Sequence, residues 1–342
     1  MASIKNVFQN LDETSIILII TVLSVIVLAY FFIYVWYMMN LQNKECDVMD
    51  ELSKKNTNVK SVNPEDSFFK DYHIQTAYNC CSLGSYSNDF VGMCALKNVI
   101  KQGVRGLDFE IFSLDDIPIV STSTTSNYYS KETYNSIDFN EVMNFIANSA
   151  FSGYSTNSND PIVLHLRFKS NNPKMYKKLA DILRNYESVL IDKQYNYSDP
   201  NFNLGMVPLR NLMGKIIIIV NNSNKSYEDS NEFGEYINMI SGTGFMRLHT
   251  YSEIKNLDNN QALELIKYNK KNMTICIPDK GNNPANPDHT LFTDTGCNMI
   301  AMRYQHIDQH LELNNTFFSD FAFVKKKRQL FIKESYLLKK VN

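Results

Sequence analysis

The sequence has no surplus of positive charge. Its 342 residues include 34 Lys and Arg against 36 Asp and Glu, so the formal net charge is -2 and the pI is near 6.3. Domains that bind nucleic acid usually carry clustered basic residues, and the one short basic run, Lys325–Arg328, stands alone. We therefore predict no nucleic-acid partner.

The chain also lacks metal-binding cysteine motifs and internal repeats. Its six cysteines show none of the spacings typical of zinc ligands, which argues against a zinc site. No repeat or break divides the long region after residue 65. We predict that this region forms one domain.

One stretch contains no charge at all. Residues 15–39 read SIILIITVLSVIVLAYFFIYVWYMM, and a helix of that length exceeds the ~30 Å hydrocarbon core of a bilayer. Tyr30, Tyr34, Trp36 and Tyr37 gather at its end, where aromatic side chains favour the headgroup level. A cleaved signal peptide is the alternative, but its apolar core is usually shorter. We predict an uncleaved single-pass transmembrane helix.

The orientation follows from the lysines that flank this helix. Lys5 precedes it, whereas Lys44, Lys54 and Lys55 follow it. Because cytoplasmic flanks carry the excess of Lys and Arg, this count favours a cytoplasmic position for the larger domain.

These features divide the chain into four parts. The segment after the helix is polar and charged, with few large apolar side chains, so it cannot build a core. The last part, of roughly 270 residues, is close to the ~250 residues of a single barrel domain. We predict an N-terminal tail at 1–14, a transmembrane helix at 15–39, a polar linker at 40–65 and a folded domain at 66–338.

Strand-like and helix-like segments alternate in the folded domain. This alternation is typical of a parallel α/β architecture, and nearly continuous apolar strands suit a sheet buried on both faces. We predict a TIM-type (β/α) barrel, with an open doubly wound sheet as the alternative. The predicted strands are 103–112, 161–168, 215–222, 273–279 and 297–305, and the clearest amphipathic helices are 140–151 and 173–186.

Five segments carry more specific patterns. They are GVRGLDFE at 103–110, PIV at 118–120, DPIVLHLR at 160–167, LMGKII at 212–217 and GCNMIAMRYQ at 296–305. In this order they resemble strands of the phosphatidylinositol-specific phospholipase C-like phosphodiesterases. The resemblance implies a TIM-type barrel and the hydrolysis of a phosphoric diester.

The resemblance also implies two catalytic histidines, one acting as general base and one as general acid. The first belongs to a motif matched by 77–81, where Tyr78 takes its position and only Asn79 is retained. The second follows the PIV segment, where Thr122 stands instead. Since a phenol with a pKa near 10 is a poor base at neutral pH, these substitutions predict a catalytically degenerate site.

Eukaryotic members of the family hold Ca²⁺ with an Asn, two Glu and an Asp, an oxygen set that suits this ion. Asn79, Asp108 and Glu110 match three of these ligands, with the acids in exchanged order, and Arg167 stands at the fourth. Strand alternation puts Asp108 with Glu110, and His165 with Arg167, on one face each. We predict that Arg167 pairs with Asp108 or Glu110 and replaces the cation. Ca²⁺ or Mg²⁺ would be required only in an active enzyme.

The substrate contacts implied by the resemblance are also depleted. Ile219 and Asn221 stand where basic residues normally reach the inositol phosphates, and Ile275 replaces an arginine. His73, five residues before Tyr78, and His165, two residues before Arg167, could offer a relocated acid–base pair, but a lone histidine is more often a hydrogen-bonded structural residue. The predicted substrate mouth of the barrel consists of His165, Arg167, Ile219, Asn221 and Ile275.

Three functions are compatible with these patterns. The one we favour is a membrane-anchored pseudoenzyme that acts as a binding or scaffold protein for a phosphoinositide headgroup or a protein partner. The first alternative is an active phosphodiesterase with altered catalytic groups, acting on phosphatidylinositol or a related diester. The second is a structural protein of a virion or host membrane, since the Asn-, Ile- and Lys-rich composition is typical of low-GC large DNA viruses.

Overall fold

The computed structural model describes residues 12–54, 58–125 and 129–326. The chain separates into two compact units, residues 1–47 and 48–342, which we describe one at a time. The end of the predicted folded domain, 327–338, lies outside the described residues.

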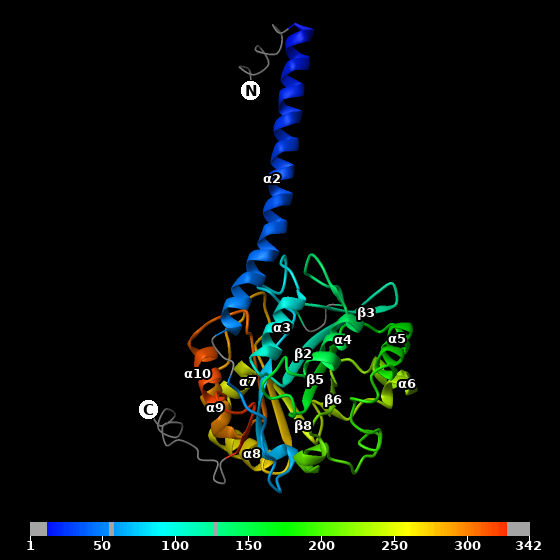
Figure 1. Ribbon diagram of the computed structural model, residues 1–342, viewed down its shortest axis with the longest axis vertical. Coiled ribbons are helices and arrows are strands. Elements are labelled where there is room, and N and C mark those ends of the chain that lie inside the picture. The colour runs from blue at the N-terminus through cyan, green and yellow to red at the C-terminus, as the bar shows by residue number, and fades with distance from the viewer. Residues whose placement is uncertain (1–11, 55–57, 126–128, 327–342) are drawn as a thin grey trace. The chain divides into compact units, whose positions relative to one another are not determined.

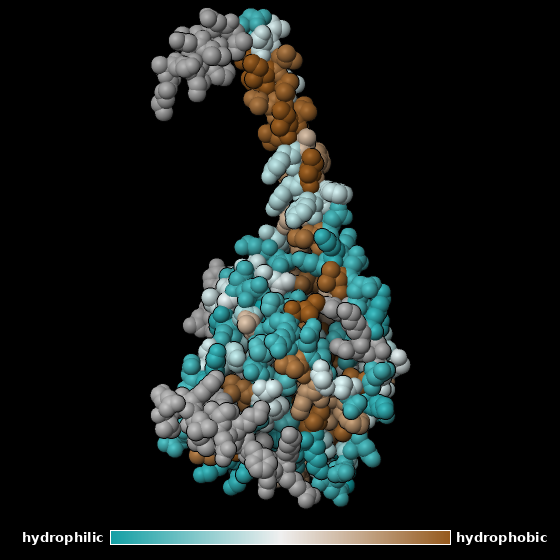
Figure 2. Space-filling model, turned by 90° about the vertical axis from the view of Figure 1, so that its left-hand side faces the viewer, coloured by the Kyte–Doolittle hydropathy of each residue, from teal (hydrophilic) through white to brown (hydrophobic). Residues whose placement is uncertain are grey.

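A single helix, α2, dominates the first unit and runs from Glu13 to Ser53. By length and composition it can cross a membrane, and Figure 2 shows hydrophobic side chains along it. Thr21 and Ser24 donate hydrogen bonds to the carbonyls of Ile17 and Ile20 at 2.8 Å each, which satisfies these hydroxyls within the helix. The helix also continues past residue 39 through much of the predicted linker, because polar side chains prevent core formation but not helix formation.

Eight parallel strands form a nearly closed barrel in the second unit (Figure 1). Their order is β7-β6-β5-β2-β1-β10-β9-β8, and a hydrogen bond from the Gly242 amide to the Met246 carbonyl joins the two ends. The predicted TIM-type barrel is confirmed, and the open-sheet alternative is wrong. The strands are β1 (Tyr72–Ala77), β2 (Gly106–Leu114), β5 (Ile162–Phe168), β6 (Ile216–Asn221), β7 (Met239–Ser241), β8 (Met246–Thr250), β9 (Met273–Ile277) and β10 (Met299–Met302).

Helices and three short antiparallel strands complete the domain. Strand β3 pairs with β2 and β4, and β11 pairs with β1. The helices are α3 (Met93–Lys101), α4 (Phe139–Ser149), α5 (Pro173–Arg184), α6 (Asn231–Gly234), α7 (Tyr251–Lys255), α8 (Asn259–Asn269), α9 (His289–Thr295) and α10 (Gln309–Phe317). The added strands are β3 (Ile117–Ser121), β4 (Ile137–Asp138) and β11 (Phe323–Lys325), and 3₁₀ turns are η1 (Phe69–Asp71), η2 (Leu204–Met206), η3 (Leu209–Asn211) and η4 (Ser226–Asp229).

Helix α5 illustrates how local sequence sets these elements. The Asn172 side chain accepts a hydrogen bond from the Lys174 amide, and Pro173 occupies the first turn, where its missing N–H costs nothing. Met175, Leu179 and Leu183 are buried, and Ile182 is half-buried beside them, so an apolar face of this amphipathic helix packs on the barrel.

Strand β6 separates the two hydrophobic cores of the barrel. Ile216, Ile218 and Val220 pack in the outer core between strands and helices. Ile217 and Ile219 alternate with them and pack in the inner core. This strand is therefore buried on both faces, as its continuous apolar sequence predicts.

Gly106 marks a close approach between β1 and β2. A Cβ added there would lie 2.9 Å from the Cβ of Thr76. We expect Gly106→Ala to lower the free energy of unfolding by about 1–3 kcal/mol, because the strands must shift to relieve this overlap. Urea unfolding measures the change. Gly153→Ala is the matched control, since nothing lies within 4 Å of its Cβ position; equal losses in the two variants would contradict the packing argument.

Candidate functional site

Polar side chains from β2 and β5 meet inside the barrel. Asp108 lies opposite His165 in the strand register, and Glu110 lies opposite Arg167. Their apolar neighbours along both strands pack in the outer core, so alternation turns these four side chains inward. All four are buried, and Arg167, the most exposed, is 4% accessible.

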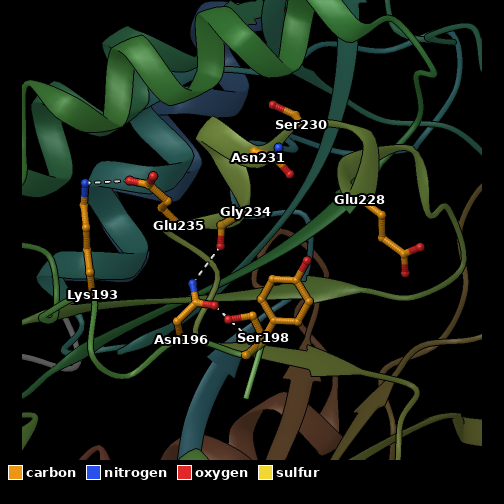
Figure 3. Close-up of a pocket in the computed structure, with 9 residues that line it drawn as sticks. Lys193, Asn196, Ser198, Glu228, Ser230, Asn231, Gly234 and Glu235 are labelled. Atoms are coloured by element: carbon orange, nitrogen blue, oxygen red, sulfur yellow. Dashed lines mark hydrogen bonds and ion pairs between the residues drawn. The ribbon is translucent and has the colours of Figure 1, made fainter. Parts of the chain in front are cut away.

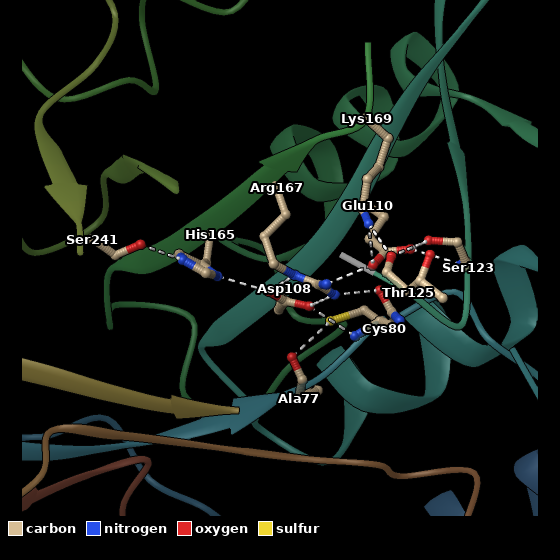
Figure 4. A network of polar contacts seen from close by, with 11 residues as sticks. Ala77, Cys80, Asp108, Glu110, Ser123, Thr125, His165, Arg167, Lys169 and Ser241 are labelled. Carbon is tan, nitrogen blue, oxygen red and sulfur yellow. Dashed lines mark hydrogen bonds and ion pairs between the residues drawn. The ribbon is translucent and has the colours of Figure 1, made fainter. Parts of the chain in front are cut away.

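The guanidinium of Arg167 is the centre of this cluster (Figure 4). Its Nη2 and Nε donate to the two carboxylate oxygens of Asp108 at 2.7 and 2.9 Å. Its Nη1 donates to Glu110 Oε1 at 2.6 Å, and Nη2 also donates to Asn79 Oδ1 at 2.8 Å. The predicted ion pair is therefore present, and it involves both acids instead of one.

The segment after β1 covers the guanidinium. The ring of Tyr78 lies 4.4 Å from the Arg167 guanidinium carbon, a cation–π distance. Asn79 has a φ of 46°, a left-handed conformation that Asn tolerates better than most residues. This backbone turn lets its amide donate to Asp108 Oδ1 at 3.1 Å while its side-chain oxygen accepts from Arg167.

The second carboxylate, Glu110, is held by the chain that follows β3. Its Oε2 accepts hydrogen bonds from the Ser123 amide at 2.8 Å and the Ser123 hydroxyl at 3.0 Å. Lys169 lies 3.6 Å from Glu110 Oε1 and donates to the Thr125 carbonyl at 2.5 Å. Thr122, at the second histidine position, donates instead to the Tyr86 carbonyl at 2.9 Å.

His165 links this cluster to β7. Its Nδ1 lies 2.6 Å from Asp108 Oδ2, and its Nε2 lies 2.8 Å from the Ser241 hydroxyl. The order Ser–His–Asp resembles that of a hydrolytic triad. However, all three side chains are 0% exposed, and Asp108 also binds Arg167. In this arrangement His165 and Ser241 orient Asp108, and none of the three side chains is exposed to contact a substrate.

Charge pairing explains how Asp108 and Arg167 stay ionised in the interior. Two carboxylates face the cations Arg167 and Lys169. Burial alone raises the pKa of Asp108, but Arg167 and the hydrogen bond from His165 outweigh it and hold that pKa below its usual range. Burial alone lowers the pKa of Arg167, but Asp108, Tyr78 and Glu110 raise it well above its usual value. For Lys169 burial prevails, and its pKa is lowered.

The oxygens that the resemblance assigns to a metal are already used. The Asn79 side-chain oxygen and both carboxylates accept hydrogen bonds from Arg167. Among the described residues, no group of three or more His, Cys, Asp or Glu side chains is placed to hold a metal ion. With Arg167 in this position, the residues present do not fit Ca²⁺ or Mg²⁺.

The other predicted mouth residues do not join the cluster. Ile219 and Ile275 are buried in the inner core. The side-chain oxygen of Asn221, at the end of β6, accepts from the Ser223 amide at 2.7 Å. Sequence reasoning missed Lys169, Ser123 and Ser241. Lys169 could have been predicted from the sequence, because it lies two residues after Arg167 and alternation places both on one face. Nothing in the sequence points to Ser241.

Comparisons with known proteins agree with this fold. Residues 225–328 match the model for the phosphatidylinositol-specific phospholipase C, Y domain. The chain is also similar to the crystal structures of L. pealei PLC21 (TM-score 0.64, 18% identity) and S. officinalis PLC21 (TM-score 0.62, 17% identity). Each similarity covers 79% of this chain and 39% of the other. Among curated protein sequences none matches.

These similarities show the fold of a phosphatidylinositol-specific phospholipase C-like phosphodiesterase. The chain spans about two fifths of the length of the two cephalopod structures. Apart from Ser241, the residues of the buried cluster precede the matched region 225–328.

Removing the guanidinium should destabilise the domain. Arg167→Met leaves Asp108 and Glu110 with an uncompensated buried charge, and breaking a buried pair typically costs about 3–5 kcal/mol. Urea unfolding at pH 7 measures this loss. The matched control is Arg184→Met, because Arg184 pairs with Asp181 in solvent and such pairs contribute about 0–1 kcal/mol. A similar small loss in both variants would contradict a buried network that depends on Arg167.

The cost of Arg167→Met should also depend on pH. The folded pKa of Asp108 lies below its unfolded value of about 3.9, so its contribution is complete above that pH and is lost as the pH falls through the folded pKa. Without Arg167, burial raises the Asp108 pKa, and protonation then removes the uncompensated charge. Because the unfolded state titrates alike in both proteins, the stability difference shrinks as the pH falls from the raised Asp108 pKa of the variant toward the lowered Asp108 pKa of the wild type. We therefore expect a larger difference at pH 7 than at pH 4. Unfolding curves at several pH values test this; a constant difference would contradict it.

Proposed function

We propose that this chain is a membrane-anchored protein with a phospholipase C-like barrel that binds a ligand or partner without cleaving a phosphodiester. The observation that supports this most directly is the guanidinium of Arg167. It sits among Asn79, Asp108 and Glu110, the three residues that resemble calcium ligands in the family.

A fixed guanidinium differs chemically from a bound metal ion. A metal can accept oxygens of a substrate and polarise them. A guanidinium has five N–H donors, and Arg167 directs four of them to protein acceptors. Few of its N–H groups remain to bind substrate oxygens. We therefore propose that Arg167 neutralises Asp108 and Glu110 and does not polarise a substrate as a metal ion would.

The two positions that resemble catalytic histidines also lack acid–base groups. Burial raises the pKa of Tyr78 well above its usual value, and its ring stacks on Arg167. The hydroxyl of Thr122 is committed to a backbone carbonyl. Since acid–base assistance contributes about 10²- to 10⁴-fold per group, losing both groups and the metal would remove most of the rate advantage.

Without the two histidines and the metal ion, binding is the function that we propose for the barrel. Helix α2 is long and apolar enough to hold the chain at a bilayer, which supports a membrane-anchored role. The fold is shared with phosphoinositide-specific phospholipases, so we propose a phosphoinositide headgroup or a protein at the membrane as the partner. A virion or host membrane, and the cytoplasmic side of it, stay predictions from the sequence.

Hydrolysis of phosphatidylinositol tests this function. The full chain is placed in lipid nanodiscs that contain phosphatidylinositol, with Ca²⁺, with Mg²⁺ or with a chelator. We expect turnover no higher than that of Asp108→Asn and Glu110→Gln variants, because the acids are occupied by Arg167. A calcium-dependent phospholipase C in the same nanodiscs is the positive control.

Two results would contradict the proposal. Turnover that disappears in the Asp108→Asn or Glu110→Gln variant would establish an active phosphodiesterase with altered catalytic groups. Stoichiometric calcium binding at micromolar concentration, measured by calorimetry, would show that Arg167 does not replace the cation.

A further inference from the structure

Four basic side chains gather at the side of the barrel where α8, α9 and α10 lie (Figure 1). They are His73 on β1, His289 at the start of α9, His310 on α10 and Lys326 just after β11. Neither the buried cluster around Arg167 nor the proposed function uses them.

The ring of Phe317, at the end of α10, connects two of these histidines. Its centroid lies 5.9 Å from that of His73 and 5.7 Å from that of His289. His73 is 4% exposed and His289 is 6% exposed. The strand neighbours of His73, Tyr72 and Ile74, pack in the inner core, so alternation turns His73 outward. The two imidazoles are therefore buried between β1, α9 and α10.

Two of the basic groups bind only neutral acceptors. His73 Nδ1 lies 2.6 Å from the Cys297 carbonyl oxygen, so this nitrogen carries a proton and donates it to the hydrogen bond. Lys326 Nζ donates to the Asn269 carbonyl at 3.2 Å and to Asn298 Oδ1 at 3.0 Å. No carboxylate among the described residues pairs with either group.

The other two histidines have unused ring nitrogens. The Nδ1 atoms of His289 and His310 are buried and have no hydrogen-bond partner among the described residues. Asp288 precedes His289, but its Oδ1 already accepts from the Thr290 amide at 3.1 Å and the Thr290 hydroxyl at 2.8 Å. A proton added to either imidazole would therefore lack a dedicated counter-ion.

Burial keeps His73 and His289 neutral at pH 7. It is the largest cause that lowers the pKa of His73 to about 3; Lys326 and His289 act in the same direction, and the backbone carbonyl opposes them. Burial also lowers the pKa of His289, against the effect of Asp288 and together with that of His310. The packing of this layer thus favours uncharged imidazoles.

Lys326 adds a positive charge to the cluster in acid. Burial lowers its pKa to about 7, although the Cys297 thiol and Asp71 raise it. Asp71 itself pairs with Lys70 at 2.6 Å, and Lys70 opposes the charge of Lys326. Below pH 7 the imidazoles must therefore take up protons beside an ammonium group.

Charged groups on the barrel surface lie in a different environment. In the cavity that Lys193, Glu228 and Glu235 line (Figure 3), Lys193 lies 3.0 Å from Glu235, and it is equally close to Glu187. The side chains of these ion pairs are about half exposed, so both solvent and opposite charge stabilise them. The layer around His73 provides neither.

We propose that His73 and His289 form an acid-sensitive switch that releases α9 and α10 from strand β1. Released imidazoles meet water, where a histidine has a pKa of about 6.5. The closed layer is therefore fully favoured above that pH, and it loses this advantage as the pH falls toward the lowered pKa of the closed state. The inference goes beyond the proposed function and does not depend on the Arg167 cluster.

Hydrogen exchange of the full chain in lipid nanodiscs tests this switch. For a histidine with a pKa of about 3 when closed and about 6.5 when released, a fall from pH 7.5 to pH 5.5 raises the released fraction about tenfold. We expect the protection factors of α9 and α10, corrected for the intrinsic pH dependence of exchange, to fall by at least that factor. Those of β5 and β6 should change by less than about twofold. An equal loss throughout the barrel, or no loss in α9 and α10, would overturn the proposal.

Two substitutions remove the titration and keep the shape of the layer. His73→Asn retains a donor toward the Cys297 carbonyl, and His289→Phe retains a ring beside Phe317. In the double variant the protection factors of α9 and α10 at the two pH values should agree within about twofold. The matched control is His249→Asn, a half-buried histidine on β8, which should keep the tenfold loss. A double variant that keeps the loss, or a control that abolishes it, would overturn the proposal.

Discussion

The buried ion pair between Arg167 and the two acids of β2 is the interaction on which the interior of the barrel depends. Bringing Asp108 and Glu110 out of water is costly unless each charge is paired and hydrogen-bonded. Arg167 meets this requirement across three strands, because its donors reach β2 and the turn after β1 from its own place on β5. Through His165 the same network extends to β7, the shortest strand of the barrel.

This constraint also sets what the interior can do chemically. The acids, the amide of Asn79 and the ring of Tyr78 each have a structural task around the guanidinium. A group that orients a buried charge cannot be released to move protons or coordinate a ligand without unpairing that charge. The same contacts that make the cluster stable therefore hold Asp108 in its charged form.

The sequence predicts the barrel and this ion pair from strand alternation together with the resemblance to the phospholipase C-like family. Alternation along 106–114 and 162–168 turns the polar side chains inward, and the matching register places Glu110 beside Arg167. Other features depend on contacts that no local pattern encodes. Strand β7 has only three residues, and β8 carries polar side chains along most of its length. Ser241 on β7 meets His165 on β5 across the intervening strand β6, a contact between segments far apart in sequence. The polar residues after 39 predict a stalk or a short helix followed by a linker, and α2 continues to Ser53.

The ion pairs inside the barrel differ in environment from those on its surface. Inside, Asp108 and Glu110 pair with Arg167 at hydrogen-bond distance, and all three side chains are buried. On the outer surface, Glu235 pairs with Lys193 at 3.0 Å, but both side chains are about half exposed. Solvent screens such exposed pairs, so they contribute about 0–1 kcal/mol. Removing one partner of the buried pairs leaves a charge that water cannot reach, so the stability of the barrel depends on Arg167 and not on the ion pairs of its surface.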